Sequence, residues 1–97
     1  MEITIKSLKF DADAKLVAFI EKKVARFEKF HEGQSDVEVT LSLLKEPANK
    51  NVKLKLHTPG ENHIIERNST TFEDAVNACV DAMKEKLTRS KEKSLEK

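Results

Sequence analysis

Polar and hydrophobic residues alternate over three stretches of the chain, which is the pattern of strands with one buried face. These stretches are residues 3–6, 37–43 and 52–57. A fourth strand is predicted over residues 63–68, although two consecutive isoleucines interrupt its alternation. The chain therefore carries the pattern of four short strands.

Turn-forming residues separate the last three predicted strands. One such segment is 47–51, which begins with a proline, and the other is 58–62, which contains Pro59 and Gly60. Short turns between successive strands form hairpins. We therefore expect an antiparallel meander with one face against helices and the other face toward solvent.

After the first strand, the spacing between apolar residues changes to three or four positions, which predicts an amphipathic helix. Asp11 or Asp13 can act as its N-cap, and Gly33 suits its C-terminal end near residues 31–33. The apolar residues of this helix follow the helical period: Leu16, Val17, Ile20, Val24 and Phe27.

A second helix is predicted from about residue 71 onward. Thr70 or Thr71 has an acidic residue three positions later, as in a capping box. Neither Pro nor Gly interrupts the chain from there to Lys97, and we expect about the last eight residues to fray. Its apolar stripe consists of Phe72, Val76, Cys79, Val80, Met83 and Leu87.

The order of these elements, β-α-β-β-β-α, predicts the architecture. We expect an α+β fold, a two-layer domain in which both helices cover one face of a four-stranded sheet. A chain of 97 residues is enough for one core, so residues 1–97 are expected to form a single domain.

Composition excludes several classes of protein. The chain is 38% hydrophobic and 36% charged with two Gly and two Pro, which excludes collagen-like and Pro/Gly-rich disordered chains. No apolar run approaches the roughly 20 residues of a membrane span, and the N-terminal stretch lacks the features of a secretory signal. The single cysteine, Cys79, cannot form an internal disulfide. We therefore expect a cytoplasmic protein without a membrane partner.

The net charge is only +1, so the placement of the charges matters more than their sum. On a helical wheel, each predicted helix carries cations in lines along its solvent side. On the first helix these are Lys15, Lys22, Arg26 and Lys29, with Lys23 beside them. On the second helix they are Lys86, Arg89 and Lys93 on one flank, with Lys84 and Lys91 on the other.

These cations have more than one interpretation. Surface helices are commonly rich in Lys and Glu, so the lines can be ordinary solvated faces. The second helix also carries an acidic line that could bind a basic protein: Asp74, Asp81, Glu85, Glu92 and Glu96. Alternatively, basic lines on two helices of one layer could flank a nucleic-acid backbone, because Lys and Arg bind phosphates by releasing counterions.

The sequence lacks the residue clusters that enzymes need. The three histidines, His31, His57 and His63, fit no zinc-ligand spacing with Cys79, which falls in an apolar stripe. His57 and His63 flank a predicted turn and could face each other, but we expect ordinary surface residues of a hairpin. We expect Cys79 to be a buried structural thiol, and we expect no catalysis, cofactor, metal or small-molecule substrate.

Four segments in this order resemble the bacterial hibernation promoting factor / ribosome-associated inhibitor family. They are 24–30 (VARFEKF), 44–47 (LKEP), 71–77 (TFEDAVN) and 87–93 (LTRSKEK), and the resemblance covers nearly the whole chain. It implies a double-stranded-RNA-binding-domain-like fold and a stress or stationary-phase role in ribosome hibernation. It also implies a chain that is a monomer away from the ribosome.

The resemblance further implies how such a protein acts. Members bind the rRNA of the small ribosomal subunit in the channel of mRNA and tRNA, and they block translation by occupancy. The cations that match the family pattern are Lys22 or Lys23, Arg26, Lys29, Arg89, Lys91 and Lys93.

The sequence also departs from the family pattern. Ala82 and Glu85 stand where relatives often carry a Lys and an Arg, with Lys84 and Lys86 each one or two positions away. Because the chain stops at Lys97, without an acidic tail or a second domain, we expect the short form of the family. Two other interpretations stay open, which are a protein-interaction adaptor and a general double-stranded RNA binder.

Overall fold

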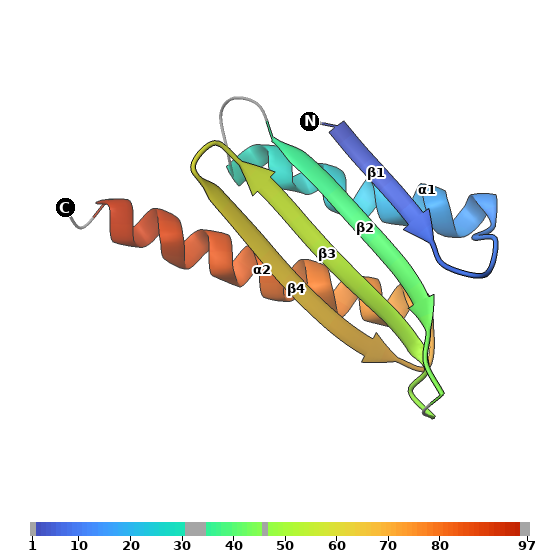
Figure 1. Cartoon of the computed structure of the whole chain (residues 1–97). Helices are drawn as coiled ribbons and strands as arrows, with labels where there is room; N and C mark the ends of the chain where they lie inside the picture. The colour runs from blue at the N-terminus through green and yellow to red at the C-terminus, as the bar shows by residue number, and fades with distance from the viewer. Residues whose placement is uncertain (1, 31–34, 46, 96–97) are drawn as a thin grey trace.

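The chain forms four strands and two α-helices in the predicted order (Figure 1). The computed structural model describes residues 2–30, 35–45 and 47–95. The strands are β1 (Glu2–Ser7), β2 (Asp36–Leu43), β3 (Lys50–Thr58) and β4 (Glu61–Ser69). The helices are α1 (Ala14–Val24), the 3₁₀ helix η1 (Ala25–Phe30) and α2 (Phe72–Leu95).

The strands form one sheet in the order β1-β2-β3-β4. β2, β3 and β4 are antiparallel neighbours, which confirms the predicted meander. β1 joins the sheet parallel to β2, with Ile3 opposite Val37 and Ile5 opposite Val39. A parallel pair requires a crossover, and α1 with η1 supplies it.

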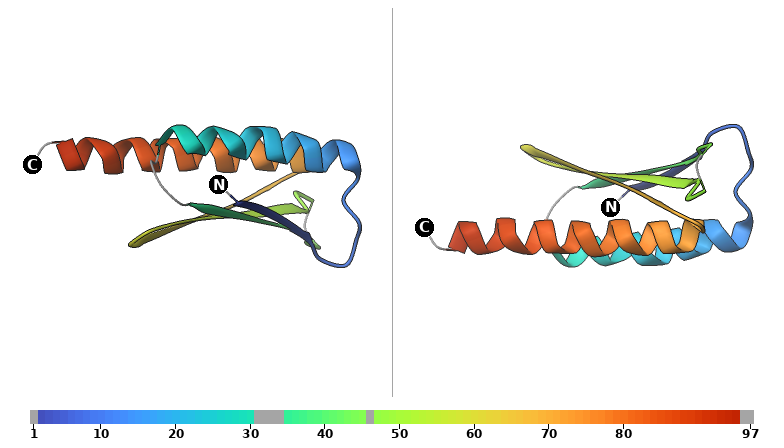
Figure 2. Two further views of the ribbon diagram at one scale, coloured as in Figure 1. Left: turned by 90° about the horizontal axis from the view of Figure 1, so that it is seen from above. Right: turned by 90° about the horizontal axis from the view of Figure 1, so that it is seen from below.

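Both helices cover the same face of the sheet, so the molecule has two layers (Figure 2). They lie side by side and run in the same general direction, and the C-terminal half of α2 projects beyond the strands. The α+β architecture predicted from the sequence is therefore confirmed. Among the described residues, no helix combines the length and the apolarity that crossing a membrane would require.

The core lies between the two layers. The inward-facing residues of β2 and β3 pack against the apolar stripes of the helices, and the predicted stripe residues Ile20, Val24 and Phe27 are at most 1% exposed. At one end of the core, Phe10 and Phe72 stack with their ring centroids 5.2 Å apart. The buried hydrophobic side chains of α2 are Ala75, Val76, Cys79, Val80 and Met83.

Side chains cap the N-termini of both α-helices. A carboxylate oxygen of Asp13 accepts a hydrogen bond from the Leu16 amide at 2.7 Å, so Asp13 and not Asp11 is the N-cap of α1. The Thr71 hydroxyl accepts one from the Asp74 amide at 3.1 Å. Each bond satisfies a donor that the first turn of a helix leaves free.

The first helix differs from its prediction in its last turns. The chain tightens into η1 at Ala25, whereas the sequence predicted an α-helix to residues 31–33, which lie outside the described residues. Val24, the last residue of α1, and Phe27 of η1 are both buried, so the core-facing side of the helix continues through the change of period.

His57 is a surface residue of the hairpin, as expected, whereas the same expectation is wrong for His63, and the two rings do not face each other. His57 is exposed on the outer face of the sheet, where its Nδ1 hydrogen-bonds the Asn62 side chain. His63 pairs with Leu56 across the hairpin, lies on the helix-covered face and is only 7% exposed. The hairpin register places the two rings on opposite faces, because neighbouring strand positions alternate.

Candidate nucleic-acid interface

The predicted cations of the first helix are distributed over α1 and η1. Lys15, Lys22 and Arg26 are exposed, so their charges face solvent. Lys23 is half-buried, and its ammonium lies 5.5 Å from the centroid of the Phe19 ring, a cation–π distance. Lys29 belongs to η1, and the structure does not describe its side chain.

The period of η1 changes how two of these positions are aligned. In a 3₁₀ helix, residues three apart lie on one line along the axis. Positions 26 and 29 both belong to η1, so they lie in line with each other. The sequence had spaced them on an α-helical wheel, where they are about 60° apart.

The predicted cations of α2 have different surroundings. Lys84 is half-buried, whereas Lys86 and Arg89 are exposed. Arg89 Nη2 lies 2.7 Å from Glu85 Oε1, and both side chains are mainly exposed (75% and 64%). An exposed pair of this kind is weak, so a phosphate can compete for the guanidinium. Lys91 and Lys93 lie on the helix backbone beyond the described side chains.

Lys84 lies on a flank of α2 that borders the core. Lys84 is four residues after Val80 and three before Leu87, and both of these belong to the core. The half-burial of Lys84 agrees with this position at the border of the core. Helices α1 and α2 lie side by side in the same layer (Figure 2).

Lys86 and Arg89 lie on the other flank of α2. The thiol of Cys79 donates a hydrogen bond to the Val52 carbonyl at 3.4 Å, so this side of the helix faces β3. On the wheel, Lys86 is within about 20° of Cys79 and Arg89 is turned further away from Val80. The two basic lines of α2 therefore do not share one surface. One lies on the side of Val80, and the other lies on the side of Cys79, in the half of α2 that projects beyond β4 (Figure 1).

The acidic line of α2 limits the basic surface. Asp74, Asp81 and Glu85 are exposed and point away from the core. They separate the two flanks of the helix on its solvent side. A polyanion on the helix layer would therefore meet its cations on α1, on η1 and on the adjoining flank of α2.

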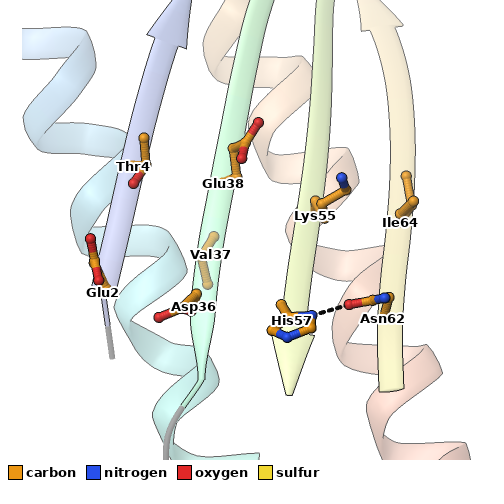
Figure 3. Close-up of a pocket in the computed structure, with 9 residues that line it drawn as sticks. All are labelled: Glu2, Thr4, Asp36, Val37, Glu38, Lys55, His57, Asn62 and Ile64. Carbon is orange, nitrogen blue, oxygen red and sulfur yellow. Dashed lines mark hydrogen bonds between the residues drawn. The ribbon is translucent and has the colours of Figure 1, made fainter. Parts of the chain in front are cut away.

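The outer face of the sheet carries a shallow hollow that the sequence did not predict (Figure 3). Its volume is about 510 Å³, and Figure 3 shows the side chains that line it on four neighbouring strands. Three carboxylates, Glu2, Asp36 and Glu38, contribute to the lining together with the single cation Lys55. This charge disfavours phosphate, and in the described part of the chain no cluster of His, Cys, Asp and Glu could hold a metal. The only signal in the sequence is the alternation that turns these residues outward.

Cys79 is not a reactive thiol. It is 1% exposed, which confirms the prediction of a buried thiol. Burial raises the pKa of Cys79 from 9.0 to about 11, against a smaller lowering by the charge of Arg67. The thiol is therefore protonated at neutral pH, and a nucleophile would need the thiolate.

Known proteins resemble the chain in sequence and in fold. The model of the family described as sigma 54 modulation protein / S30EA ribosomal protein matches residues 3–94. The N-terminal domain of Thermus thermophilus Protein Y has a TM-score of 0.81 at 21% identity, over 92% of this chain and 98% of that chain. A ribosomal subunit interface protein from Coxiella burnetii has a TM-score of 0.79 at 19% identity, over 94% of this chain and 98% of that chain.

At these identities the two structures show a shared fold. No curated protein sequence matches the chain. The family model, however, covers all of β1 but its first residue, the other three strands, all of α1, and all of α2 but its last residue. The family recognised from the sequence is thereby confirmed, and the chain belongs to the sigma 54 modulation protein / S30EA ribosomal protein family.

Proposed function

We propose that the chain is a ribosome hibernation factor that binds the rRNA of the small ribosomal subunit and blocks translation by occupying the channel of mRNA and tRNA. The observation that carries this proposal is the set of exposed cations on α1 and η1, Lys15, Lys22 and Arg26, in the same helix layer as the half-buried Lys84 of α2. Family membership supports it, and so does the name of the similar Coxiella protein, which is a ribosomal subunit interface protein. The protein acts without chemistry, in the cytoplasm and as a single copy.

The physical basis is electrostatic. Lys and Arg side chains that replace counterions along an RNA backbone gain affinity without reading bases. A rigid layer of two packed helices holds those side chains at fixed spacing, and it can therefore recognise the shape of folded RNA. The half-buried Lys23 and Lys84 lose less side-chain freedom on binding than fully exposed lysines do.

Sedimentation of the protein with its own ribosomes tests this proposal. We expect it to migrate with small subunits at low salt and to dissociate at high salt. For six phosphate contacts, the logarithm of the affinity should fall with the logarithm of salt concentration with a slope of about −4 to −5. Free protein at low salt would contradict the proposal. Equal binding to any RNA duplex would favour a general double-stranded RNA binder.

A further inference from the structure

The outermost strand β4 is open on one side. In the part of the chain that the structure describes, β4 pairs with β3 only, over nine residues from Glu61 to Ser69. It contains neither Pro nor Gly, the two residues that most often interrupt such an edge. Unpaired amide and carbonyl groups along an edge are a template for another strand.

The hairpin register identifies which backbone groups point outward. Thr58 and Glu61 close the two-residue turn formed by Pro59 and Gly60, where Gly60 has a φ of 85°. The backbone N–H and C=O groups of the closing pair point toward each other, between β3 and β4. Those of successive strand residues then point alternately toward β3 and away from it. The outward groups are therefore those of Asn62, Ile64, Glu66 and Asn68.

Arg67 supports this orientation and places a positive charge on the helix-covered face of the edge, whereas Glu66 lies on the outer face. Its Nη1 donates a hydrogen bond to the Glu66 carbonyl at 2.8 Å, which agrees with a carbonyl that points away from β3. The Arg67 side chain is exposed. A guanidinium has five N–H donors, and the remaining ones can bind a carboxylate.

Helix α2 lies beneath this edge of the sheet. Figure 1 shows α2 crossing beneath β4, with its C-terminal half projecting beyond the strand. On the wheel, the small, half-buried residue Ala82 lies within about 40° of Lys86 on that flank of α2 and leaves room for a backbone. The flank continues with the exposed cations Lys86 and Arg89.

We propose that the β4 edge binds an extended acidic segment of a protein partner, which adds to the sheet as a fifth strand. The segment alternates acidic residues, which face Arg67 and Lys86, with apolar residues, which lie beside Ile64 on the outer face. Ile64 is 48% exposed and gains a cross-strand neighbour on binding. RNA cannot replace this partner, because its backbone offers no amide donors to the strand.

A synthetic peptide tests the proposal. The probe is a fluorescently labelled ten-residue peptide that alternates Glu and Val, and its counterpart alternates Lys and Val. We expect the Glu peptide to bind at least tenfold more tightly in anisotropy titrations. We also expect it to protect the amides of Asn62, Ile64, Glu66 and Asn68 from hydrogen exchange. Equal affinity of the two peptides, no binding of the Glu peptide, or protection of β1 in place of β4 would overturn the proposal.

Two variants of one residue separate backbone pairing from side-chain contact. Ile64→Pro removes an outward N–H that makes no bond to β3, so the fold is expected to persist and peptide affinity to fall at least tenfold. Ile64→Thr keeps the N–H and a β-branched side chain, and its affinity is expected to stay within threefold of the original. Equal affinities of these variants would contradict strand addition. Ribosome sedimentation of Ile64→Pro is expected to be unchanged, so this test and that of ribosome binding fail independently.

Discussion

Cys79 shows how burial determines the chemistry of a single residue. Its side chain contacts the backbone of β3 through a hydrogen bond to Val52 and is shielded from water by the core. Its pKa of about 11 follows mainly from the cost of placing a thiolate there. Cysteine is the most nucleophilic residue type in the chain, yet Cys79 serves to pack the core.

The raised pKa of Cys79 predicts a loss of stability at alkaline pH. The unfolded chain releases the thiol proton near pH 9.0, whereas the folded chain holds it up to about pH 11. The contribution of the thiol is therefore complete below pH 9 and is lost between pH 9 and 11, by about 2 to 3 kcal/mol.

Urea unfolding at pH 8 and at pH 11 measures this loss. Lysines also titrate in this range, so the comparison is with Cys79→Ala, in which they are retained. We expect the free energy of unfolding to fall more steeply with pH in the original chain than in the variant. Parallel pH profiles would show that the thiol is not desolvated.

Asn51 shows what the alternation of polar and hydrophobic residues could not predict. Alternation correctly placed the aliphatic side chains of β2 and β3 inward, because hydrophobic burial dominates their placement. Asn51 was assigned to a turn, yet it is 6% exposed and lies between hydrogen bonds to Ser42 and Asn68. Cross-strand partners satisfy this polar group, and they are known only once the register is known.

The helix boundaries depend on a few local bonds. Asp11 and Asp13 were equivalent candidates for the N-cap of α1, and only the backbone geometry distinguishes them. The change from α-helix to 3₁₀ helix at Ala25 was not predictable either. Val24 and Phe27 fit a helix of either period, and packing against the sheet decides between them.

The Asp13 cap predicts a difference between two neighbouring carboxylates. Asp13→Ala is expected to lower the free energy of unfolding by about 1 kcal/mol, because the Leu16 amide loses its acceptor. Asp11→Ala removes an equal charge from an exposed position and is expected to change it by less than about 0.5 kcal/mol. Urea denaturation measures both values, and equal losses would mean that the charges act only on the helix dipole.

At the scale of the whole molecule, the sequence predicted the architecture better than the surface. Strand order follows from the meander and the crossover, which are local rules. The surface depends on how two helices are rotated against each other. That rotation leaves Lys84 half-buried on the Val80 side of α2 but Lys86 and Arg89 exposed on other sides of the helix, although all three belong to one basic segment of the sequence.

Charge reversal on one layer and on the other tests which surface meets RNA. Arg26→Glu with Lys29→Glu is expected to weaken ribosome binding and to make its salt slope shallower by about 1.4 to 1.8, the share of two phosphate contacts. The matched control is Lys53→Glu with Lys55→Glu, two exposed lysines on the outer face of the sheet.

The control pair changes the net charge equally, so it is expected to have a much smaller effect on the salt slope. Sedimentation at several salt concentrations measures the slopes. Equal weakening by both pairs would show that net charge, and not the helix layer, determines binding.

The parallel pairing of β1 has a consequence for the order in which the chain folds. β1 is synthesised first, but its only strand neighbour among the described residues is β2, which begins at Asp36, after the crossover. In a nascent chain, the N-terminal segment therefore has no strand to pair with until β2 and the rest of the meander have formed. The three later strands can assemble through adjacent turns alone, so β1 is the segment whose docking completes the native sheet.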